Sequence, residues 1–312
     1  MRAAERLPLT AACKHYSRIG EVPWDIQKYW HQRYSIFSYY DYDIRLTDDA
    51  WFGVTPEPVA TQIATDLAGS APPSKTILVD LFAGAGGNAI AFALSGRWDR
   101  VVAVEKDAAT LACAQHNAEM YEVPDGLITW VNDDCFEYLA LLRREGGGVG
   151  AQGGSPARHS ESDSDNDSSS DSDSDSDGSN DIDSSSDSDS GSSSRGSAKS
   201  DSKKQGSPLD SALRIDLTTA QIFASPPWGG VGYGAQAVFD VEAMQPYGLT
   251  QLHEACRPYA HALYLPRTSD LRQIARLVPE GRKVEVVQYC MEGASKAMVA
   301  YIPDADEAAP SK

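Results

Sequence analysis

The sequence is poor in cysteine, and none of its cysteines forms a CxxC pair. The 312 residues include five, at Cys13, Cys113, Cys135, Cys256 and Cys290. An odd, scattered set argues against a disulfide framework and a zinc site and favours a reducing compartment, so we expect no bound metal. No apolar run approaches the roughly 18 residues of a membrane-spanning helix, and residues 1–16 lack a continuous apolar stretch like that of a secretory signal. We therefore expect neither membrane insertion nor export.

Positive charge is also scarce, with 27 Lys and Arg against 45 Asp and Glu and a net charge of −18. The acidity is concentrated in Ser160–Ser194, where 18 serines and 12 acidic residues occupy 35 positions and Ile182 is the one aliphatic residue. Such a segment cannot bury enough apolar surface to offset chain entropy, so we predict a disordered insertion over residues 146–208. Ser160–Ser194 carries −12, which leaves −6 on the rest of the chain. The low isoelectric point therefore does not exclude a nucleic-acid substrate, and we expect a local contact with one RNA end.

Strand and helix patterns alternate outside this insertion, which predicts a mostly parallel sheet covered on both faces. The last two strand candidates are joined by a short link around Gly293 and predict an antiparallel hairpin. Seven strand candidates occur: 76–82, 100–104, 128–131, 220–224, 261–265, 283–290 and 296–302. Helical stretches occur at 56–68, 89–94, 108–121, 136–144, 249–258 and 271–278. In such sheets a ligand lies beyond the carboxyl ends of the strands.

A glycine-rich turn, AGAGGN over residues 83–88, follows the first strand candidate. The second strand candidate ends at Glu105, 21 residues after Gly84, where a carboxylate can accept both hydroxyls of a ribose. This unit fits NAD or S-adenosylmethionine. Asp80, before the glycines, suits a cationic methionine group better than a pyrophosphate, and Asp133 after the third strand suits an adenine amino group. Each acid alone also fits a helix cap or a solvated loop, but their combination favours the methyl donor.

The sequence SPPWGG follows the fourth strand candidate at residues 225–230. Paired prolines fix the backbone in an extended turn. The Ser225 hydroxyl and the carbonyls of Ser225 and Pro226 can accept hydrogen bonds from an exocyclic amine. Trp228 offers a flat surface for stacking on a planar, cationic heterocycle. The alternative is a proline-rich turn with a core tryptophan.

Aromatic residues are frequent near the N-terminus, in YWHQRYSIFS at residues 29–38 and in WFGVTPE at residues 51–57. They predict a packed helical extension that caps the cofactor cleft, and Thr55 is predicted to be the N-cap of the next helix. With VDLFAGAGGN, SPPWGG and LPR at residues 265–267, the chain resembles the trimethylguanosine synthase family of RNA cap methyltransferases. The resemblance runs from about Asp25 to Ile302, apart from the insertion. It implies the class I (Rossmann-like) methyltransferase fold.

The resemblance also implies the reaction and its residues. The expected activity is transfer of methyl from S-adenosylmethionine to the N2 amine of the 7-methylguanosine cap of small nuclear and nucleolar RNAs, giving 2,7-di- or 2,2,7-trimethylguanosine. The expected cofactor residues are Phe37, Thr55, Asp80, Gly84, Glu105, Asp133 and Ser225. Trp228 would stack on the cationic base, and the cap phosphates would be held by Lys28, Tyr233 and Arg267. Ser225 and Pro226, with Trp228, would catalyse by positioning the amine.

The expected organisation is a helical extension at 1–54, a methyltransferase domain at 55–303 interrupted by the insertion, and a tail at 304–312. The expected partner is m7G-capped RNA, bound by a monomer in the nucleus, including nucleolar or Cajal-body-like sites, with some protein in the cytoplasm. The insertion is open to several interpretations: a solvated spacer, a docking tail for basic proteins, or a kinase substrate. Two alternatives for the function are methylation of a base amine inside RNA and an inactive cap-binding module.

Overall fold

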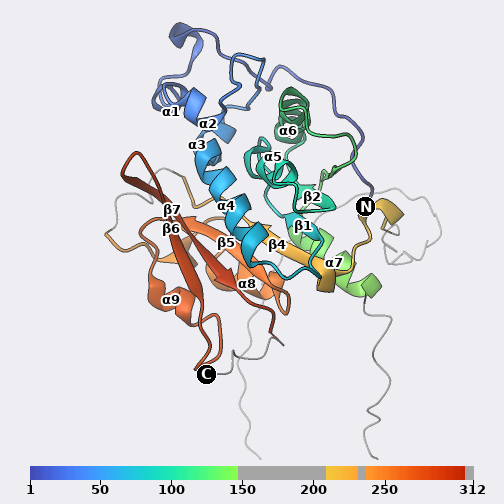
Figure 1. Cartoon of the computed structure of the whole chain (residues 1–312). Helices are drawn as coiled ribbons and strands as arrows, with labels where there is room; N and C mark the ends of the chain where they lie inside the picture. The colour runs from blue at the N-terminus through green and yellow to red at the C-terminus, as the bar shows by residue number, and fades with distance from the viewer. Residues whose placement is uncertain (147–208, 231–236, 306–312) are drawn as a thin grey trace, which may run out of the picture. The chain divides into compact units, whose positions relative to one another are not determined.

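A seven-stranded sheet forms the centre of the computed structural model, which describes residues 1–146, 209–230 and 237–305 (Figure 1). The strand order is β3-β2-β1-β4-β5-β7-β6. Strands β1 to β5 are parallel, whereas β7 runs antiparallel to both β5 and β6. The strands are β1 (Ile77–Asp80), β2 (Arg100–Val104), β3 (Ile128–Val131), β4 (Ala220–Ala224), β5 (His261–Pro266), β6 (Glu285–Met291) and β7 (Ala294–Ile302). The predicted α/β fold and its terminal hairpin are confirmed.

Three predictions fall outside the described residues. The predicted insertion, apart from its first residue, lies there, as do Tyr233 and most of the predicted tail. All described residues belong to one compact unit. Within the described ranges, no helix combines the length and the apolar character that a membrane crossing requires.

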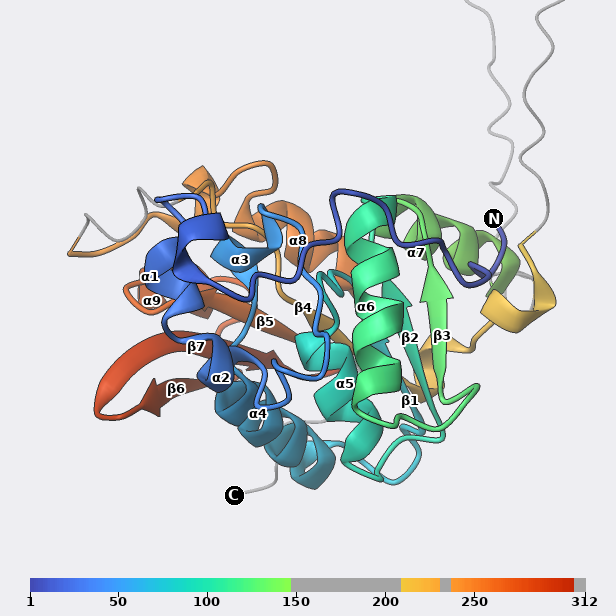
Figure 2. The same cartoon turned by 90° about the horizontal axis from the view of Figure 1, so that it is seen from above.

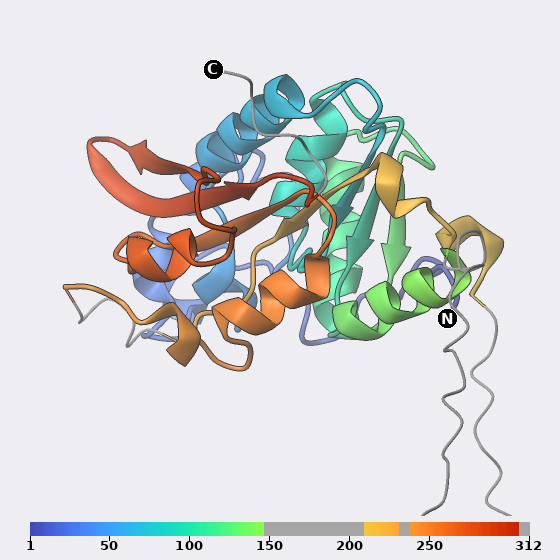
Figure 3. The same cartoon turned by 90° about the horizontal axis from the view of Figure 1, so that it is seen from below.

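Helices cover both faces of the sheet. The apolar sides of α4 (Glu57–Ser70), α5 (Gly87–Leu94) and α6 (Ala108–Met120) join one core cluster, in front of the sheet in Figure 2. The helices α7 (Cys135–Gly146), α8 (Leu249–Cys256) and α9 (Leu271–Ala275) lie on the opposite face, as Figure 3 shows, and their apolar sides join a second cluster. Successive strand residues point to opposite faces, so Leu78 of β1 lies in the first cluster and Val79 in the second.

The N-terminal extension is helical only over single turns: the 3-10 turn Ile19–Glu21, α1 (Gln27–Trp30), α2 (Arg33–Ile36) and α3 (Ala50–Gly53). Its aromatic side chains hold it in place. Trp30, Phe37, Tyr40 and Trp51 are all buried in the cluster that contains α4 and α5. The Trp30 indole also donates to the carbonyl of Tyr16 at 2.9 Å. The extension is therefore ordered by tertiary packing, since a single helical turn has little stability alone.

The start of α4 differs from the prediction. Its N-cap residue is Pro56, and no side chain caps it. The Thr55 hydroxyl instead accepts a hydrogen bond from the Asn88 amide at 3.1 Å. The N-cap prediction for Thr55 was wrong because the chain turns this side chain toward α5, where it joins α4 to the glycine-rich turn.

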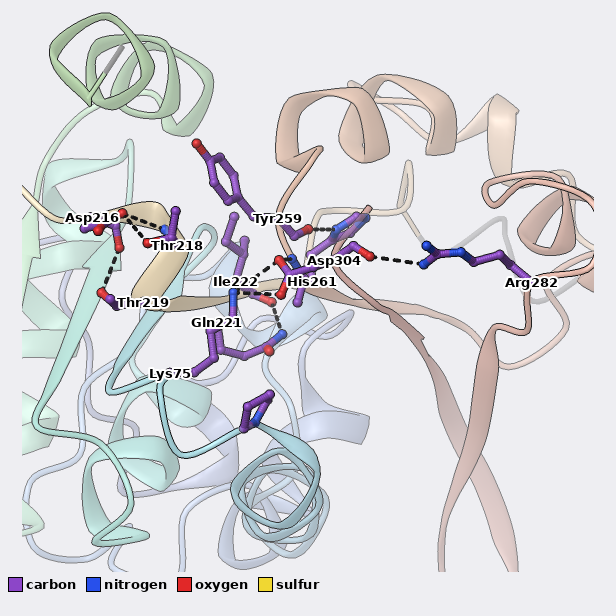
Figure 4. Close-up of polar contacts among 12 residues, drawn as sticks. Lys75, Asp216, Thr218, Thr219, Gln221, Ile222, Tyr259, His261, Arg282 and Asp304 are labelled. Carbon is purple, nitrogen blue, oxygen red and sulfur yellow. Dashed lines mark hydrogen bonds and ion pairs between the residues drawn. The ribbon is translucent and has the colours of Figure 1, made fainter. Parts of the chain in front are cut away.

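A polar cluster lies at the amino ends of the central strands (Figure 4). Lys75, just before β1, is 3% exposed, and its ammonium lies 3.0 Å from the carboxylate of Asp304, just after β7. The same carboxylate accepts from the amide of Ala260 at 2.6 Å, and the Asp304 carbonyl accepts from Arg282 at 3.2 Å. These contacts tie the first strand to the segment that follows the last one.

A buried histidine pair lies beside this cluster. Nδ1 of His253 in α8 is 3.0 Å from Nε2 of His261 in β5. The other ring nitrogen of His261, Nδ1, lies 2.7 Å from the carbonyl of Tyr259 and therefore donates to it. Burial lowers the pKa of both rings, that of His261 to about 4. Both histidines are therefore neutral at pH 7.

The two chain ends that flank the predicted insertion are joined. The Glu145 carboxylate, near the end of α7, accepts from the amide of Leu209 at 3.0 Å. Its second oxygen pairs with the Arg214 guanidinium at 2.8 Å. The chain therefore leaves and re-enters the fold at neighbouring points.

Candidate functional site

A cavity of about 880 Å³ opens beyond the carboxyl ends of β1 to β4. Two parts of the chain build it: the loops that follow these strands and the N-terminal extension. From the loops come Leu81 to Ala85, Gly87, Asn88, Val104 to Asp107, Ala109, Thr110, Asp133 to Cys135, Ser225 to Pro227, Pro246 and Tyr247. From the extension and the entry to α4 come Ala12, Lys14, Thr47 to Ala50, and Gly53 to Thr55.

The glycine-rich turn forms the floor of this cavity and is fixed by Glu105. One carboxylate oxygen of Glu105 accepts from the amide of Gly84 at 3.0 Å, and the other accepts from that of Asp107 at 2.9 Å. Burial raises the Glu105 pKa. Gly86 has φ of +96°, and a Cβ there would lie 3.2 Å from Cα of Ala114 in α6. Only glycine therefore allows the turn to pack this closely against α6.

Two buried oxygens beside the turn lack a hydrogen-bond partner among the described residues. One is Oδ2 of Asp80, whose side chain is fully buried and whose Oδ1 accepts from Phe82 at 3.2 Å. The other is Oδ1 of Asn88. Burial, with the nearby charge of Glu105, raises the Asp80 pKa to about 7. Unpaired buried acceptors are costly, and such a pair fits a ligand that brings a cation.

A second acidic group lies at the other end of the cavity. Asp133 and Asp134 follow β3, and Lys106 lies 3.4 Å from the Asp134 carboxylate. The Tyr247 hydroxyl donates to the same carboxylate at 3.5 Å, and its ring lies 4.7 Å from that of Phe136. Carboxylates beside aromatic rings suit a heterocycle that carries an amino group.

The turn after β4 reaches the same cavity. Ser225 and Pro226 line it, whereas Trp228, two residues further on, does not. The Trp228 indole stacks on the Tyr264 ring at 5.5 Å, with an interplanar angle of 24°. Its N–H donates to the carbonyl of Tyr264 at 3.3 Å. β5 therefore holds the indole in a fixed orientation, just past the residues that line the cavity.

The structure brings together six of the predicted site residues as cavity lining: Thr55, Gly84, Glu105, Asp133, Ser225 and Pro226. Asp80 lies behind the lining. Phe37 is buried and lines a separate cavity of about 120 Å³, with Gly87 shared between the two. Lys28, on α1, and Arg267, after β5, are exposed, and neither lines the cavity.

The sequence analysis predicted that the extension caps the cofactor cleft, but it did not name Lys14, Thr47 or Asp48, which line the cavity. The Lys14 ammonium pairs with the Asp48 carboxylate at 2.6 Å, and the Tyr16 hydroxyl donates to the other oxygen of Asp48, also at 2.6 Å. No motif links positions so far apart in the sequence. Asn88 could have been predicted from the sequence, because it is the last residue of the glycine-rich turn. In the part of the chain that the structure describes, no three His, Cys, Asp or Glu side chains gather as a metal site.

This sheet order, with a glycine-rich turn after β1 and an acid at the end of β2, is that of a class I methyltransferase, and the family match that follows identifies S-adenosylmethionine as its methyl donor. Residues 75–305 match the family described as RNA cap guanine-N2 methyltransferase. The chain belongs to this family, and it is an enzyme that methylates the N2 amine of the guanosine cap of RNA.

Two curated relatives agree with this assignment, and a solved structure shares the fold. The chain is 26% identical to a trimethylguanosine synthase of Schizosaccharomyces pombe over 90% of its own length and 87% of that relative. It is 27% identical to a trimethylguanosine synthase of Saccharomyces cerevisiae, over 80% of its own length and 57% of that relative. A crystal structure of a Porphyromonas gingivalis protein, described as a methyltransferase, shares the fold with a TM-score of 0.50 and 12% identity, over 93% of this chain and 53% of that one.

Proposed function

We propose that the 880 Å³ cavity binds S-adenosylmethionine and delivers its methyl group to the amine held by Ser225 and Pro226. The observation that carries this proposal is the shared lining: both residues face the same cavity as Gly84 and Glu105. In the proposed arrangement Glu105 accepts the ribose hydroxyls, Asp133 meets the adenine amino group, and Asp80 faces the methionine end. The unpaired oxygens of Asp80 and Asn88 support a cationic group there.

The cap itself binds on the far side of Ser225 in this proposal. Trp228 stacks on the 7-methylguanine, because an electron-rich indole attracts a cationic ring. Its stacking on Tyr264 fixes the platform before the cap arrives. Lys28, Tyr233 and Arg267 hold the cap phosphates, and Phe37 and Thr55 complete the cofactor side. The exposure of Lys28 and Arg267 leaves both available to an anionic ligand.

Catalysis by this site rests on placement. Ser225 and Pro226 offer a hydroxyl and backbone carbonyls to the amine and hold it in line with the methyl group. An effective molarity of about 10⁵ M or more is within the range of well-oriented reactions. The proposed proton acceptor for the methylated amine is water.

The finer features of the function are inferred from the names of the two yeast relatives and from the sequence. We propose that the substrates are small nuclear and nucleolar RNAs, that the product is 2,7-di- or 2,2,7-trimethylguanosine, and that the enzyme works mainly in the nucleus as a monomer. The names of both yeast relatives support the trimethylated product. The division into residues 1–54, 55–303 and 304–312 and the docking of basic proteins or kinases on the insertion remain proposals of the same kind.

The test is mass spectrometry of m7GTP and of a capped oligonucleotide after incubation with S-adenosylmethionine. We expect one or two added methyl groups on capped substrates and none on GTP or uncapped RNA. Trp228→Ala should abolish turnover while leaving S-adenosylhomocysteine affinity within a few-fold, because the lost stacking contact is worth about 1–3 kcal/mol and the misaligned amine costs more. Trp24→Ala, at a tryptophan that is 86% exposed, is the matched control. Normal turnover by Trp228→Ala would overturn the cap-side assignment.

A further inference from the structure

Asn117 of α6 joins the glycine-rich turn to the N-terminal extension. Its side chain is fully buried. The amide nitrogen donates both to the carbonyl of Ala85 in the turn, at 2.9 Å, and to that of Arg45 in the extension, at 2.8 Å. The amide oxygen accepts from the backbone N–H of Arg45 at 2.8 Å. The two N–H donors and the acceptor of this side chain are therefore all used, on the glycine-rich turn and on the Arg45 segment of the extension.

The segment that Asn117 holds leads directly into the cavity wall. Leu46, next to Arg45, forms an antiparallel bridge with Lys14: each amide donates to the other residue's carbonyl, at 2.9 and 3.0 Å. Thr47 follows, and its hydroxyl lies 3.0 Å from that of Thr110 in α6. Lys14, Thr47 and Asp48 all line the cavity. Figure 2 shows the extension running alongside α6.

We propose that Asn117 is a positioning residue that couples occupation of the cofactor cavity to closure of the extension over it. This rests on the proposed function of the cavity. The extension lines one wall with Ala12, Lys14 and Thr47 to Ala50, and the turn lines another with Ala83 to Ala85, Gly87 and Asn88. A cofactor that contacts both walls binds the closed arrangement better than an open one, and so it shifts the population toward closure.

We assign the coupling to Asn117 because its side chain bonds at once to the turn, at Ala85, and to the extension, at Arg45. The turn has its own support from Glu105 and from close packing on α6. The extension has its own support from buried aromatic residues. Removing Asn117 therefore leaves each wall in place and breaks the link between the turn and the Arg45 segment, while the Asn88–Thr55 bond still joins the turn to the entry of α4.

The decisive experiment uses the unmodified protein and measures backbone hydrogen exchange with and without S-adenosylhomocysteine. We expect ligand-dependent protection of the turn, 83–88, and also of the amides of Lys14, Arg45 and Leu46. Protection of the turn alone would overturn the coupling and leave the cavity assignment intact. Protection of neither segment would overturn the proposed cofactor site itself. This measurement requires no variant and does not depend on one folding.

Variants then assign the coupling to Asn117. Asn117→Asp keeps an acceptor for Arg45 and loses both donors, and Asn117→Ala loses all three bonds. We expect about a 10- to 100-fold weaker affinity for S-adenosylhomocysteine, because buried carbonyls lose their partners, and loss of ligand-dependent protection at residues 14 and 45–46.

The matched control is Gln115→Ala, on the same helix. The Gln115 side chain is also buried and bonds to the extension, at Leu7 and Glu5, outside the cavity wall. It should leave affinity within twofold and the protection pattern unchanged. Equal losses in the Gln115 and Asn117 variants would mean that α6 merely anchors the extension, and would overturn the proposal.

Discussion

Lys75 and Asp304 form an ion pair that joins the first and last strands of the sheet. Lys75 is 3% exposed, whereas the Asp304 side chain retains 33% exposure, so the pair lies at the edge of the interior. Its other partners, Ala260 and Arg282, come from the segments before β5 and β6. One carboxylate residue therefore fastens the amino end of β1 to three later segments.

Lys75→Met should lower the free energy of unfolding by about 2 kcal/mol. Breaking a fully buried ion pair costs more than this, but solvent at the partly exposed Asp304 carboxylate reduces the loss of stability here. Urea unfolding measures this. The double variant Lys75→Met/Asp304→Asn should lose less than the two single variants combined. Arg272→Met, in a pair whose Arg272 side chain is 79% exposed, is the control and should change stability by well under about 1 kcal/mol. Equal effects of Lys75→Met and Arg272→Met would contradict this interpretation.

Asp80 should make cofactor binding depend on pH. Its pKa, raised to about 7 by burial, means that the carboxyl is largely protonated at pH 6 and must ionise to pair with a cation. Affinity for S-adenosylmethionine should therefore rise by up to about tenfold per pH unit below pH 7 and level off above it. Calorimetry between pH 5.5 and 8.5 measures this. Asp80→Asn should bind more weakly by about 1.5–3 kcal/mol and show a flatter profile.

The apo protein gives an independent check on Asp80. A raised pKa contributes stability that is complete below the unfolded value of 3.8 and is lost as pH rises through about 7. Asp80→Asn should therefore raise the Tm at pH 8. The corresponding gain in the free energy of unfolding has an upper limit of about 4 kcal/mol. S-adenosylhomocysteine separates the two cationic groups of the cofactor. It keeps the pH dependence if Asp80 faces the ammonium and loses it if Asp80 faces the sulfonium. If binding of neither ligand depended on pH and Asp80→Asn did not raise the Tm, the pKa of Asp80 would not be raised by burial.

The His253–His261 pair should make the fold sensitive to acid. Burial depresses the pKa of both rings, that of His261 to about 4, so their contribution is complete above the unfolded value of 6.5 and is lost as pH falls toward 4. The loss at pH 5 should be on the order of 2 kcal/mol. Thermal unfolding of His253→Gln/His261→Gln should show a smaller decline in Tm between pH 6.5 and 4.5 than the unmodified protein. Parallel curves would assign acid sensitivity to other groups.

Replacing residues 146–208 by a short Gly/Ser linker should leave Tm and turnover of m7GTP nearly unchanged. Leu209 is hydrogen-bonded to Glu145, so a short link can span the gap, and loop length changes closure entropy only logarithmically. Activity on long RNA should rise at low salt and converge with the unmodified protein as salt increases. A variant of full length with its acidic residues neutralised separates charge from length. A linker variant that fails to fold, or loses turnover on m7GTP, would show a structural role for the segment.

Strand positions were predictable because buried strands are short apolar runs bounded by polar residues. The limits of β2, β3 and β4 agree with the prediction residue for residue. Helix ends were less predictable. The helix predicted over 271–278 ends at Ala275, and its last amides bond in a tighter pattern, as in Arg276 to Gln273. Pro279 disfavours helical geometry in the residue before it, and the chain tightens ahead of that point.

Local motifs predicted those lining residues that belong to the motifs themselves. Gly84, Glu105 and Ser225 follow strands, and parallel strands end at one edge of the sheet. Lys14 and Asp48 were not predictable, because their pairing depends on how the extension folds back over α6. Side chains that act through tertiary contact leave no period or spacing in the sequence.

The place of β7 in the sheet has a consequence for biosynthesis. Residues 294–302 come last among the strands, yet they lie between β5 and β6 and pair with both. A nascent chain that has emerged only as far as β6 therefore exposes two unsatisfied strand edges, which are ready templates for pairing with another chain. Strand β6 cannot join the sheet until this segment has left the ribosome exit tunnel, because β6 pairs with β7. Until β7 pairs with them, chaperones must cover the exposed edges of β5 and β6, or translation must be fast enough to keep the exposure short.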